Sequence, residues 1–245
     1  MNDVFVAKGL SKTFGALRAL RGLSFSLGRG EILGIAGPNG SGKSTLFNVL
    51  TKIPFGPDEG ELRLDGRLLG GMSARQIVEA GLVRIFQTET DFETLTVLEN
   101  VLVALPDEDF RQGRSAAERH AMEFLSYVGL QKEAGRIASA ITVYDRKKLM
   151  IATALACRPK VLLLDEPAAG LSRPEVAEMI EIIRRINADG VSIIVIEHII
   201  SLLVSVSNRL LVLNFGELLA EGAPQDVIRD PRVIEAYLGT AAAHA

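Results

Sequence analysis

Residues 37–45 bring glycines, a lysine and hydroxyl side chains together in the run Gly-Pro-Asn-Gly-Ser-Gly-Lys-Ser-Thr. Glycines let backbone N–H groups close around a phosphate, and the start of a following helix adds about half a positive charge. Lys43 adds a full charge, and Ser44 offers a hydroxyl to Mg²⁺. The run follows a predicted strand at 31–36 and opens a predicted helix at 45–51, which is the context that a phosphate-binding loop requires. The loop residues predicted to bind nucleotide are Gly37, Pro38, Asn39, Gly40, Ser41, Gly42, Lys43, Ser44 and Thr45.

Two adjacent carboxylates, Asp165 and Glu166, end the apolar run 161–164. That run does not alternate polar with apolar residues, which is typical of a central strand covered on both faces. We expect Asp165 to hold Mg²⁺, commonly through water, and Glu166, on the opposite face, to polarise a water that attacks the terminal phosphate. Two acids that end a buried strand are unfavourable without a cation, which favours a metal and nucleotide site over a solvated strand end.

The elements that must position these residues alternate between strands rich in Val, Ile and Leu and longer helical patterns. This alternation predicts βαβ units around a largely parallel sheet. The clearest strands are at 31–36, 161–165 and 191–197. Residues 4–10 and 20–27 alternate around turn residues and predict a small antiparallel β layer at the start of the chain.

The middle of the chain, from about residue 91 to residue 150, has helical periods and no convincing strand. The predicted helices there span 97–104, 116–128 and 146–156. The sequence has no internal repeat and no linker rich in Pro or in Gly and Ser, which argues against two tandem domains. We therefore predict one domain, 1–245, in which 1–90 and 151–245 form the α/β core and about 91–150 forms an inserted helical lobe.

Composition excludes several classes of protein. With 48% hydrophobic and 23% charged residues, the chain has the balance of a soluble globular protein and not of a disordered one. A surface that neutralises many nucleic-acid phosphates needs a basic excess, whereas 27 Lys and Arg here face 30 Asp and Glu, so no nucleic-acid partner is expected. The longest apolar stretch, 193–206, is interrupted by Glu197 and His198 and is too short to span a bilayer. We expect a cytoplasmic chain that reaches a membrane only through a partner.

The order of these motifs resembles that of an ATP-binding-cassette (ABC) ATPase, over nearly the whole chain. After the phosphate loop come a lone glutamine, Gln87, then the run 161–171 with its two acids, and then Ile-Glu-His at 196–198. Segments 34–40, 96–101, 166–171 and 222–239 are similar to the cytoplasmic ATPase subunits of branched-chain amino-acid importers. The resemblance implies an α/β fold, a P-loop NTPase (ABC ATPase) core with an antiparallel β layer and an inserted helical lobe.

The resemblance also implies roles for single residues. Gln87 matches a glutamine that contacts Mg²⁺ and the attacking water, and His198 matches a histidine that contacts the γ-phosphate, so both join Glu166 as predicted catalytic residues. Phe14 matches an aromatic residue that stacks on adenine, and Thr142 keeps the hydroxyl of a signature motif that faces the nucleotide of a partner. The predicted metal ligands are Ser44, Gln87 and Asp165, and the predicted cofactors are ATP and Mg²⁺.

The signature motif is where the chain departs from the family. Members carry L-S-G-G-Q or a form like L-[SA]-Y-G-Q, and this chain has Ile-Thr-Val-Tyr-Asp at 141–145. Tyr144 replaces a glycine that lets backbone amides approach a phosphate, and Asp145 places a carboxylate where a neutral amide is expected. The basic run 146–148 that follows is interpreted as a solvated helix face. A further expectation is a coupling surface at 91–97, with Phe92 and Leu95 as apolar residues in a polar stretch.

The function that the resemblance implies is that of an ATP-hydrolysing transporter subunit on the inner face of the membrane, importing branched-chain amino acids or similar small solutes. Its expected partners are two transmembrane permease subunits, an extracytoplasmic solute-binding protein that acts indirectly, and a second ABC ATPase subunit. A heterodimer is favoured because an intact partner signature would complete the site on this chain's phosphate loop.

Three alternatives differ in class. The altered signature also fits an ATP-dependent scaffold or regulatory subunit with little hydrolysis. A soluble ABC ATPase acting on nucleic acid or ribosomes typically has two cassettes or a long coiled coil, and this sequence has neither. A P-loop kinase leaves Gln87 and His198 unexplained.

Overall fold

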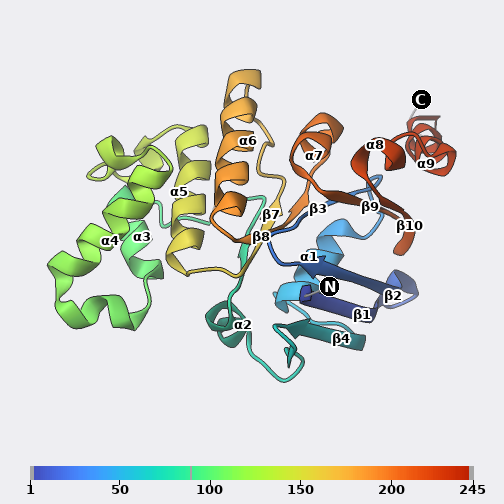
Figure 1. Ribbon diagram of the computed structural model, residues 1–245, viewed down its shortest axis with the longest axis horizontal. Helices are drawn as coiled ribbons and strands as arrows, with labels where there is room; N and C mark the ends of the chain where they lie inside the picture. The colour runs from blue at the N-terminus through green and yellow to red at the C-terminus, as the bar shows by residue number, and fades with distance from the viewer. Residues whose placement is uncertain (1–2, 89, 243–245) are drawn as a thin grey trace.

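The computed structural model describes residues 3–88 and 90–242, which fold into two sheets and surrounding helices (Figure 1). The smaller sheet is antiparallel, with the strand order β2-β1-β4-β5. Its strands are β1 (Asp3–Phe14), β2 (Leu17–Gly28), β4 (Glu59–Leu64) and β5 (Arg67–Leu68). The predicted antiparallel layer is confirmed. Its first two strands are longer than predicted, and the sequence pattern did not predict β4 and β5.

The larger sheet carries the site and has the strand order β10-β9-β3-β8-β7-β6. Its strands are β3 (Ile32–Ala36), β6 (Leu82–Ile85), β7 (Val161–Asp165), β8 (Ser192–Ile196), β9 (Arg209–Asn214) and β10 (Glu217–Gly222). All neighbours pair in parallel except β10, which runs antiparallel to β9. Parallel strands end at one edge of a sheet, so the residues that follow β3, β6, β7 and β8 meet there.

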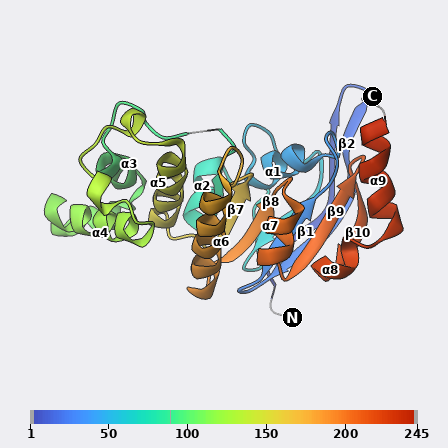
Figure 2. The same cartoon turned by 90° about the horizontal axis from the view of Figure 1, so that it is seen from above.

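Helices cover both faces of the larger sheet. Helix α1 (Lys43–Thr51) lies between the two sheets, where its Leu46, Phe47 and Leu50 pack against residues of both. On the other face lie α6 (Arg173–Ala188) and α7 (Ile200–Val206), as Figures 1 and 2 show. Strands β3, β7 and β8 are buried along their whole length, which explains why their sequences do not alternate. The remaining helices of the core are α2 (Ala74–Ala80), α8 (Pro224–Val227) and α9 (Pro231–Ala242).

A helical lobe projects to one side of the core, at the left of both views. It contains α3 (Val97–Ala104), α4 (Arg114–Tyr127) and α5 (Val143–Ala156), joined by short 3₁₀ turns. Helix α3 begins with a capping box, in which the Thr96 side chain accepts from the backbone of Glu99 and the Glu99 carboxylate accepts from the backbone of Thr96. No helix among residues 3–88 and 90–242 is long and apolar enough to cross a membrane.

The interpretation of residues 146–148 as a solvated helix face is wrong. The Arg146 side chain is only 13% exposed, and its guanidinium forms an ion pair at 2.9 Å with Asp91, which is 2% exposed. A second ion pair joins Arg146 to Glu93 at 3.0 Å. Lys148 is also 13% exposed and pairs with Asp145 at 2.7 Å. Arg146 therefore anchors the segment that follows Gln87 to α5, across 55 positions of sequence.

Candidate nucleotide site

The loop between β3 and α1 has a backbone that only glycine allows at two positions. Gly37 has φ 152° and Gly42 has φ 106°. A Cβ atom would lie 2.3 Å from the Leu213 carbonyl oxygen at Gly37 and 2.7 Å from the Ala19 carbonyl oxygen at Gly42. The loop is therefore tightly packed against β9 and β2, and its open side faces solvent at Asn39 and Gly40.

Lys43 lies beneath this loop and folds back onto it. Its Nζ donates to the carbonyl oxygens of Gly37 (2.7 Å) and Pro38 (3.0 Å). Burial lowers the pKa of Lys43, and the charges of Glu166 and Asp165 oppose that shift. The Ser41 hydroxyl is buried and has no hydrogen-bond partner among the described residues. A buried hydroxyl without a partner, beside a cation and a helix N-terminus, fits a loop shaped for an anion.

A hollow of about 550 Å³ opens above the loop. It brings together most of the predicted nucleotide and catalytic residues from four separate segments of the chain. Its lining consists of Leu17, Arg18, Ala19, Arg21, Asn39, Gly40, Ser41, Gly42, Lys43, Ser44, Thr45, Gln87, Glu166, His198 and Phe215. Sequence reasoning missed Arg18, Arg21 and Phe215, which come from β2 and from the β9–β10 turn. Phe215 is 72% exposed, a signal that only the structure provides.

Glu166 is the centre of the polar groups in this hollow. Its Oε2 accepts from Gln87 Nε2 at 2.7 Å, and its Oε1 lies 2.7 Å from His198 Nε2. Its backbone has φ 50°, and its N–H donates to the Ile196 carbonyl oxygen of β8 at 2.9 Å. The left-handed turn after β7 therefore aims the carboxylate at the ends of β6 and β8, where Gln87 and His198 begin their loops.

Glu197, which the sequence analysis assigned no role, fixes the loops that carry these residues. It is 2% exposed, and its Oε1 accepts from the Ala168 N–H at 2.7 Å. Its Oε2 accepts from the N–H groups of His198 (3.1 Å) and Ile199 (3.4 Å). Burial raises the pKa of Glu197, and these three hydrogen bonds oppose the shift. An acid directly after the apolar run 193–196 was the available signal.

Asp165 lies below the hollow, in the sheet itself. Its side chain is 7% exposed, and its Oδ2 pairs with the Arg84 guanidinium of β6 at 2.6 Å. Burial raises the pKa of Asp165, and Arg84 opposes that shift through its hydrogen bond and its charge. Arg84 also donates to Asn48 Oδ1 of α1 at 2.8 Å. The sequence signal for Arg84 was a single arginine within an otherwise apolar strand.

Two predicted site residues lie elsewhere. Phe14 is outside the set of described residues that line the hollow, and its ring packs edge-on against Phe55 with 5.0 Å between ring centres. Lys12 Nζ lies 5.6 Å from the centre of the Phe14 ring. Thr142 caps the N-terminus of α5 in the lobe and is not close to this chain's own phosphate loop. Its predicted partner is the nucleotide of a second cassette.

The donor set fits magnesium. The Ser44 hydroxyl, the Asp165 carboxylate and the Gln87 amide oxygen are hard oxygen donors of the kind that Mg²⁺ prefers. Oδ1 of Asp165 makes no hydrogen bond within the described part of the chain. The described residues contain no group of three or more His, Cys, Asp or Glu placed to hold a metal ion. Such a site suits Mg²⁺, which is usually bound through one or two carboxylates together with substrate phosphates and several waters.

Comparisons with known proteins agree with this geometry. The ABC transporter family matches residues 20–169, and the branched-chain amino acid ATP-binding cassette transporter family matches residues 217–243. The chain is 38% identical to the high-affinity branched-chain amino acid transport ATP-binding protein LivG of Salmonella typhimurium, covering 97% of this chain and 98% of LivG. It is 34% identical to the corresponding protein BraF of Pseudomonas aeruginosa, with the same two shares covered.

Solved structures give the same result. The ADP conformation of MJ1267, an ATP-binding cassette of an ABC transporter, superposes with a TM-score of 0.87 at 28% identity, covering 98% of this chain and all of that one. A nucleotide-free ATP-binding cassette from an ABC transporter superposes with a TM-score of 0.85, also at 28% identity, covering 96% of this chain and 98% of that one. The matched segment 20–169 holds both the phosphate loop and the two acids, and the chain belongs to the ABC transporter family as an ATP-hydrolysing cassette subunit.

Proposed function

We propose that this chain binds Mg-ATP in the hollow above residues 37–45 and hydrolyses it to drive import of branched-chain amino acids or similar small solutes. One observation carries the proposal: Gln87 and His198 both lie 2.7 Å from the carboxylate of Glu166, directly over the phosphate loop. The chemistry is phosphoryl transfer to water, in which positioning and charge neutralisation account for nearly all of the catalysis.

The phosphates would be held by backbone N–H groups of the loop and by Lys43. Ser44, Asp165 and the amide oxygen of Gln87 would hold Mg²⁺, which would neutralise charge that develops on the phosphates. Glu166 would then accept a hydrogen bond from the attacking water and polarise it.

Both oxygens of Glu166 are engaged by Gln87 and His198 in this geometry. A γ-phosphate offers the His198 imidazole an alternative acceptor. We infer that His198 leaves Oε1 when nucleotide is bound, which frees that oxygen for the water. His198 is 45% exposed and follows a strand end, so its side chain has room to turn.

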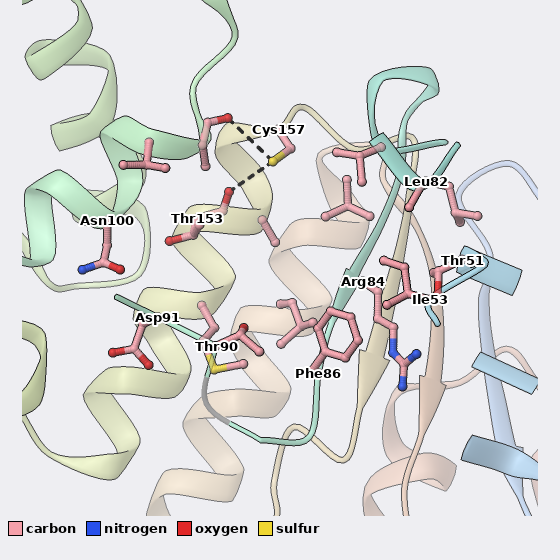
Figure 3. Close-up of a pocket in the computed structure, with 18 of the residues that line it drawn as sticks. Thr51, Ile53, Leu82, Arg84, Phe86, Thr90, Asp91, Asn100, Thr153 and Cys157 are labelled. Carbon is pink, nitrogen blue, oxygen red and sulfur yellow. Dashed lines mark hydrogen bonds between the residues drawn. The ribbon is translucent and has the colours of Figure 1, made fainter. Parts of the chain in front are cut away.

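A permease would dock on the apolar groove shown in Figure 3, which has a volume of about 260 Å³. The groove lies between the core and the lobe, and residues of α2, β6, α3 and α5 line it. Phe92 lines the groove and is 54% exposed, whereas Leu95 of the predicted coupling surface is not part of the lining. The buried Asn100 fixes the Phe92 backbone, accepting from its N–H at 2.7 Å and donating to its carbonyl at 3.1 Å. A short cytoplasmic helix of a permease subunit is the occupant that we propose.

The transported solute is inferred from the relatives. LivG and BraF are named as branched-chain amino acid transport proteins, and the C-terminal residues 217–243 match the family of that name. No residue of the hollow contacts the solute in this scheme, since its specificity would belong to the permease and to an extracytoplasmic binding protein.

The signature segment supports a heteromeric pair of cassettes. The Thr142 hydroxyl donates to Asp145 Oδ2 at 2.9 Å and accepts from the Asp145 N–H at 3.1 Å, so its proton is already used within the chain. Asp145 also places a carboxylate in the first turn of α5, where a partner's phosphate would bind. A partner with an intact signature would complete the site on this chain's phosphate loop, and the opposite site would be slow.

Tyr144 obstructs the approach of a partner's nucleotide less than a bulky side chain in place of glycine would suggest. Its hydroxyl donates to Glu178 of α6 at 2.8 Å, and Lys148 Nζ lies 4.6 Å from its ring centre. The ring is therefore directed along the lobe toward α6. Asp145 is therefore the main obstacle to a partner's phosphate in this segment, and the same residue supports the second candidate function, an ATP-dependent scaffold or regulatory subunit with little hydrolysis.

The test is Glu166→Gln in the chain assembled with its partner cassette and permease. ATP binding should persist while turnover at this chain's phosphate loop collapses, because the amide keeps the shape and loses the basic oxygen. Glu181→Gln, on the exposed face of α6, is the matched control and should leave turnover unchanged. Equal turnover in the Glu166→Gln assembly and its parent would assign catalysis elsewhere, and negligible turnover in the parent would favour the scaffold.

A further inference from the structure

Arg84 is a charged residue in the interior of the core, at a position where β6 meets α1 and β7. Its side chain is 6% exposed. It forms an ion pair with Asp165 Oδ2 at 2.6 Å and donates to Asn48 Oδ1 at 2.8 Å. Its guanidinium carbon lies 4.4 Å from the centre of the Phe86 ring and 5.4 Å from that of Phe47. One planar cation thus contacts a predicted magnesium ligand, the phosphate-loop helix and the last residue before Gln87.

Fold stability alone is a weak reason for this arrangement. A buried ion pair must overcome the desolvation of both charges, and well-packed apolar residues often serve equally well. The Nε atom of Arg84 is, in addition, buried without a hydrogen-bond partner among the described residues, which carries a further penalty. Burial of the Arg84 guanidinium is energetically unfavourable, and its position beside Asp165 therefore points to a role at that carboxylate.

The geometry defines what Arg84 does to Asp165. By holding Oδ2, it fixes the rotation of the carboxylate and presents Oδ1 as the oxygen that remains for a cation. Mg²⁺ demands near-ideal octahedral geometry, so the orientation of a ligating carboxylate matters more than it would for a larger cation. Residues that orient metal ligands commonly affect metal affinity as strongly as 10- to 100-fold.

Arg84 and its neighbour Phe86 also border the apolar groove. Phe86 and Arg84 both line that groove, and Figure 3 shows the Phe86 ring beside the Arg84 side chain, whose guanidinium extends away toward the core. A displacement of the Phe86 ring by an occupant of the groove would therefore bear on the guanidinium, and through it on Asp165.

We propose that Arg84 is a positioning residue that orients the magnesium carboxylate Asp165 and ties it, through Phe86, to the wall of the apolar groove. This inference rests on the proposed function, because it takes Asp165 as a ligand of Mg²⁺. It adds to that function a contact route between the groove and the metal site that is separate from Gln87.

The first experiment measures ATP affinity of the purified chain by calorimetry, with Mg²⁺ and in EDTA, and compares the two. Arg84→Lys keeps the charge but loses the planar fork that reaches Asn48 and Asp165 together. We expect the gain in affinity that Mg²⁺ confers to fall roughly tenfold, while ATP affinity in EDTA stays within about twofold of the parent. If Arg84→Lys fails to fold, Asn48→Ala removes only the hydrogen bond from Arg84 to Asn48. This variant should lower the Mg²⁺-dependent gain in ATP affinity to a smaller extent.

The second experiment tests the link to the groove with the same measurement. Phe86→Leu removes the stacked ring and should lower the Mg²⁺-dependent gain, whereas Val103→Ala, which shortens another groove-lining side chain on α3, should not. A lowered melting temperature of Arg84→Lys with an unchanged Mg²⁺-dependent gain would overturn the positioning role. An unchanged gain in Phe86→Leu would overturn the link to the groove. A parent chain whose ATP affinity ignores Mg²⁺ would instead overturn the proposed function.

Discussion

Asp145→Asn isolates the electrostatic part of the altered signature. The amide keeps an oxygen that can accept from the Thr142 hydroxyl, so the cap of α5 is retained while the charge is removed. At an effective dielectric near 20, a carboxylate about 4 Å from a phosphate oxygen costs on the order of 4 kcal/mol. Lys148 Nζ lies 2.7 Å from the Asp145 carboxylate. With this ammonium group on the side of the carboxylate away from the phosphate, its attraction to the phosphate oxygen offsets about 2.5 kcal/mol of the repulsion. The remaining repulsion is about 1.7 kcal/mol, or roughly fifteenfold in affinity for each composite site.

The assay is ATP-dependent self-association of the purified chain, followed by analytical ultracentrifugation in a Glu166→Gln background in which ATP persists. Asp145→Asn should strengthen self-association about fifteenfold for each site formed. Glu118→Gln, which removes a similar charge from an exposed position on α4, is the control and should have no effect. Tight self-association and cooperative hydrolysis by the parent chain alone, unchanged by Asp145→Asn, would refute the reasoning.

Three further predictions concern the site and its surroundings. Lys43→Ala removes a charge-assisted phosphate contact worth about 1.5–3 kcal/mol, and calorimetry should find ATP binding weakened roughly ten- to a hundredfold; unchanged affinity would contradict the site assignment. Phe92→Ala should leave thermal stability near that of the parent and reduce stimulation of ATPase activity by the permease, because its side chain is half exposed at the groove; full stimulation would exclude this surface. Tyr237→Phe removes the hydroxyl that accepts from the Gly37 N–H at 2.8 Å, so ATP affinity should fall about two- to tenfold; an equal affinity would show that α9 does not support the loop.

Local patterns predicted the parts of the fold that depend on local interactions. The phosphate loop, the two acids at the end of β7 and the lobe helices each follow from a short stretch of sequence, and α3 was predicted at its observed limits, Val97–Ala104. Strand β4 was missed because it carries several charged residues and becomes a strand only by pairing with β1, about fifty positions earlier. Periodicity detects burial on one face and does not detect such distant pairing.

The same reason explains the site residues that sequence reasoning missed. Arg146 lies in a basic run that reads as a solvated helix face, and only the fold brings it against Asp91. Arg84 and Asp165 are 81 positions apart and meet because β6 and β7 are neighbours in the sheet. Glu197 gained its role from three backbone N–H groups that no side-chain pattern reveals.

The ion pair between Arg146 and Asp91 ties the segment that begins at Gln87 to the helical lobe. Its upstream end is held by β6 in the core, and its downstream end is held by α5 in the lobe. A rotation of the lobe away from the core would therefore move Asp91 together with α5. Gln87 lies four positions before Asp91, so the same rotation would act on its hydrogen bond to Glu166 and couple the position of the lobe to the hollow.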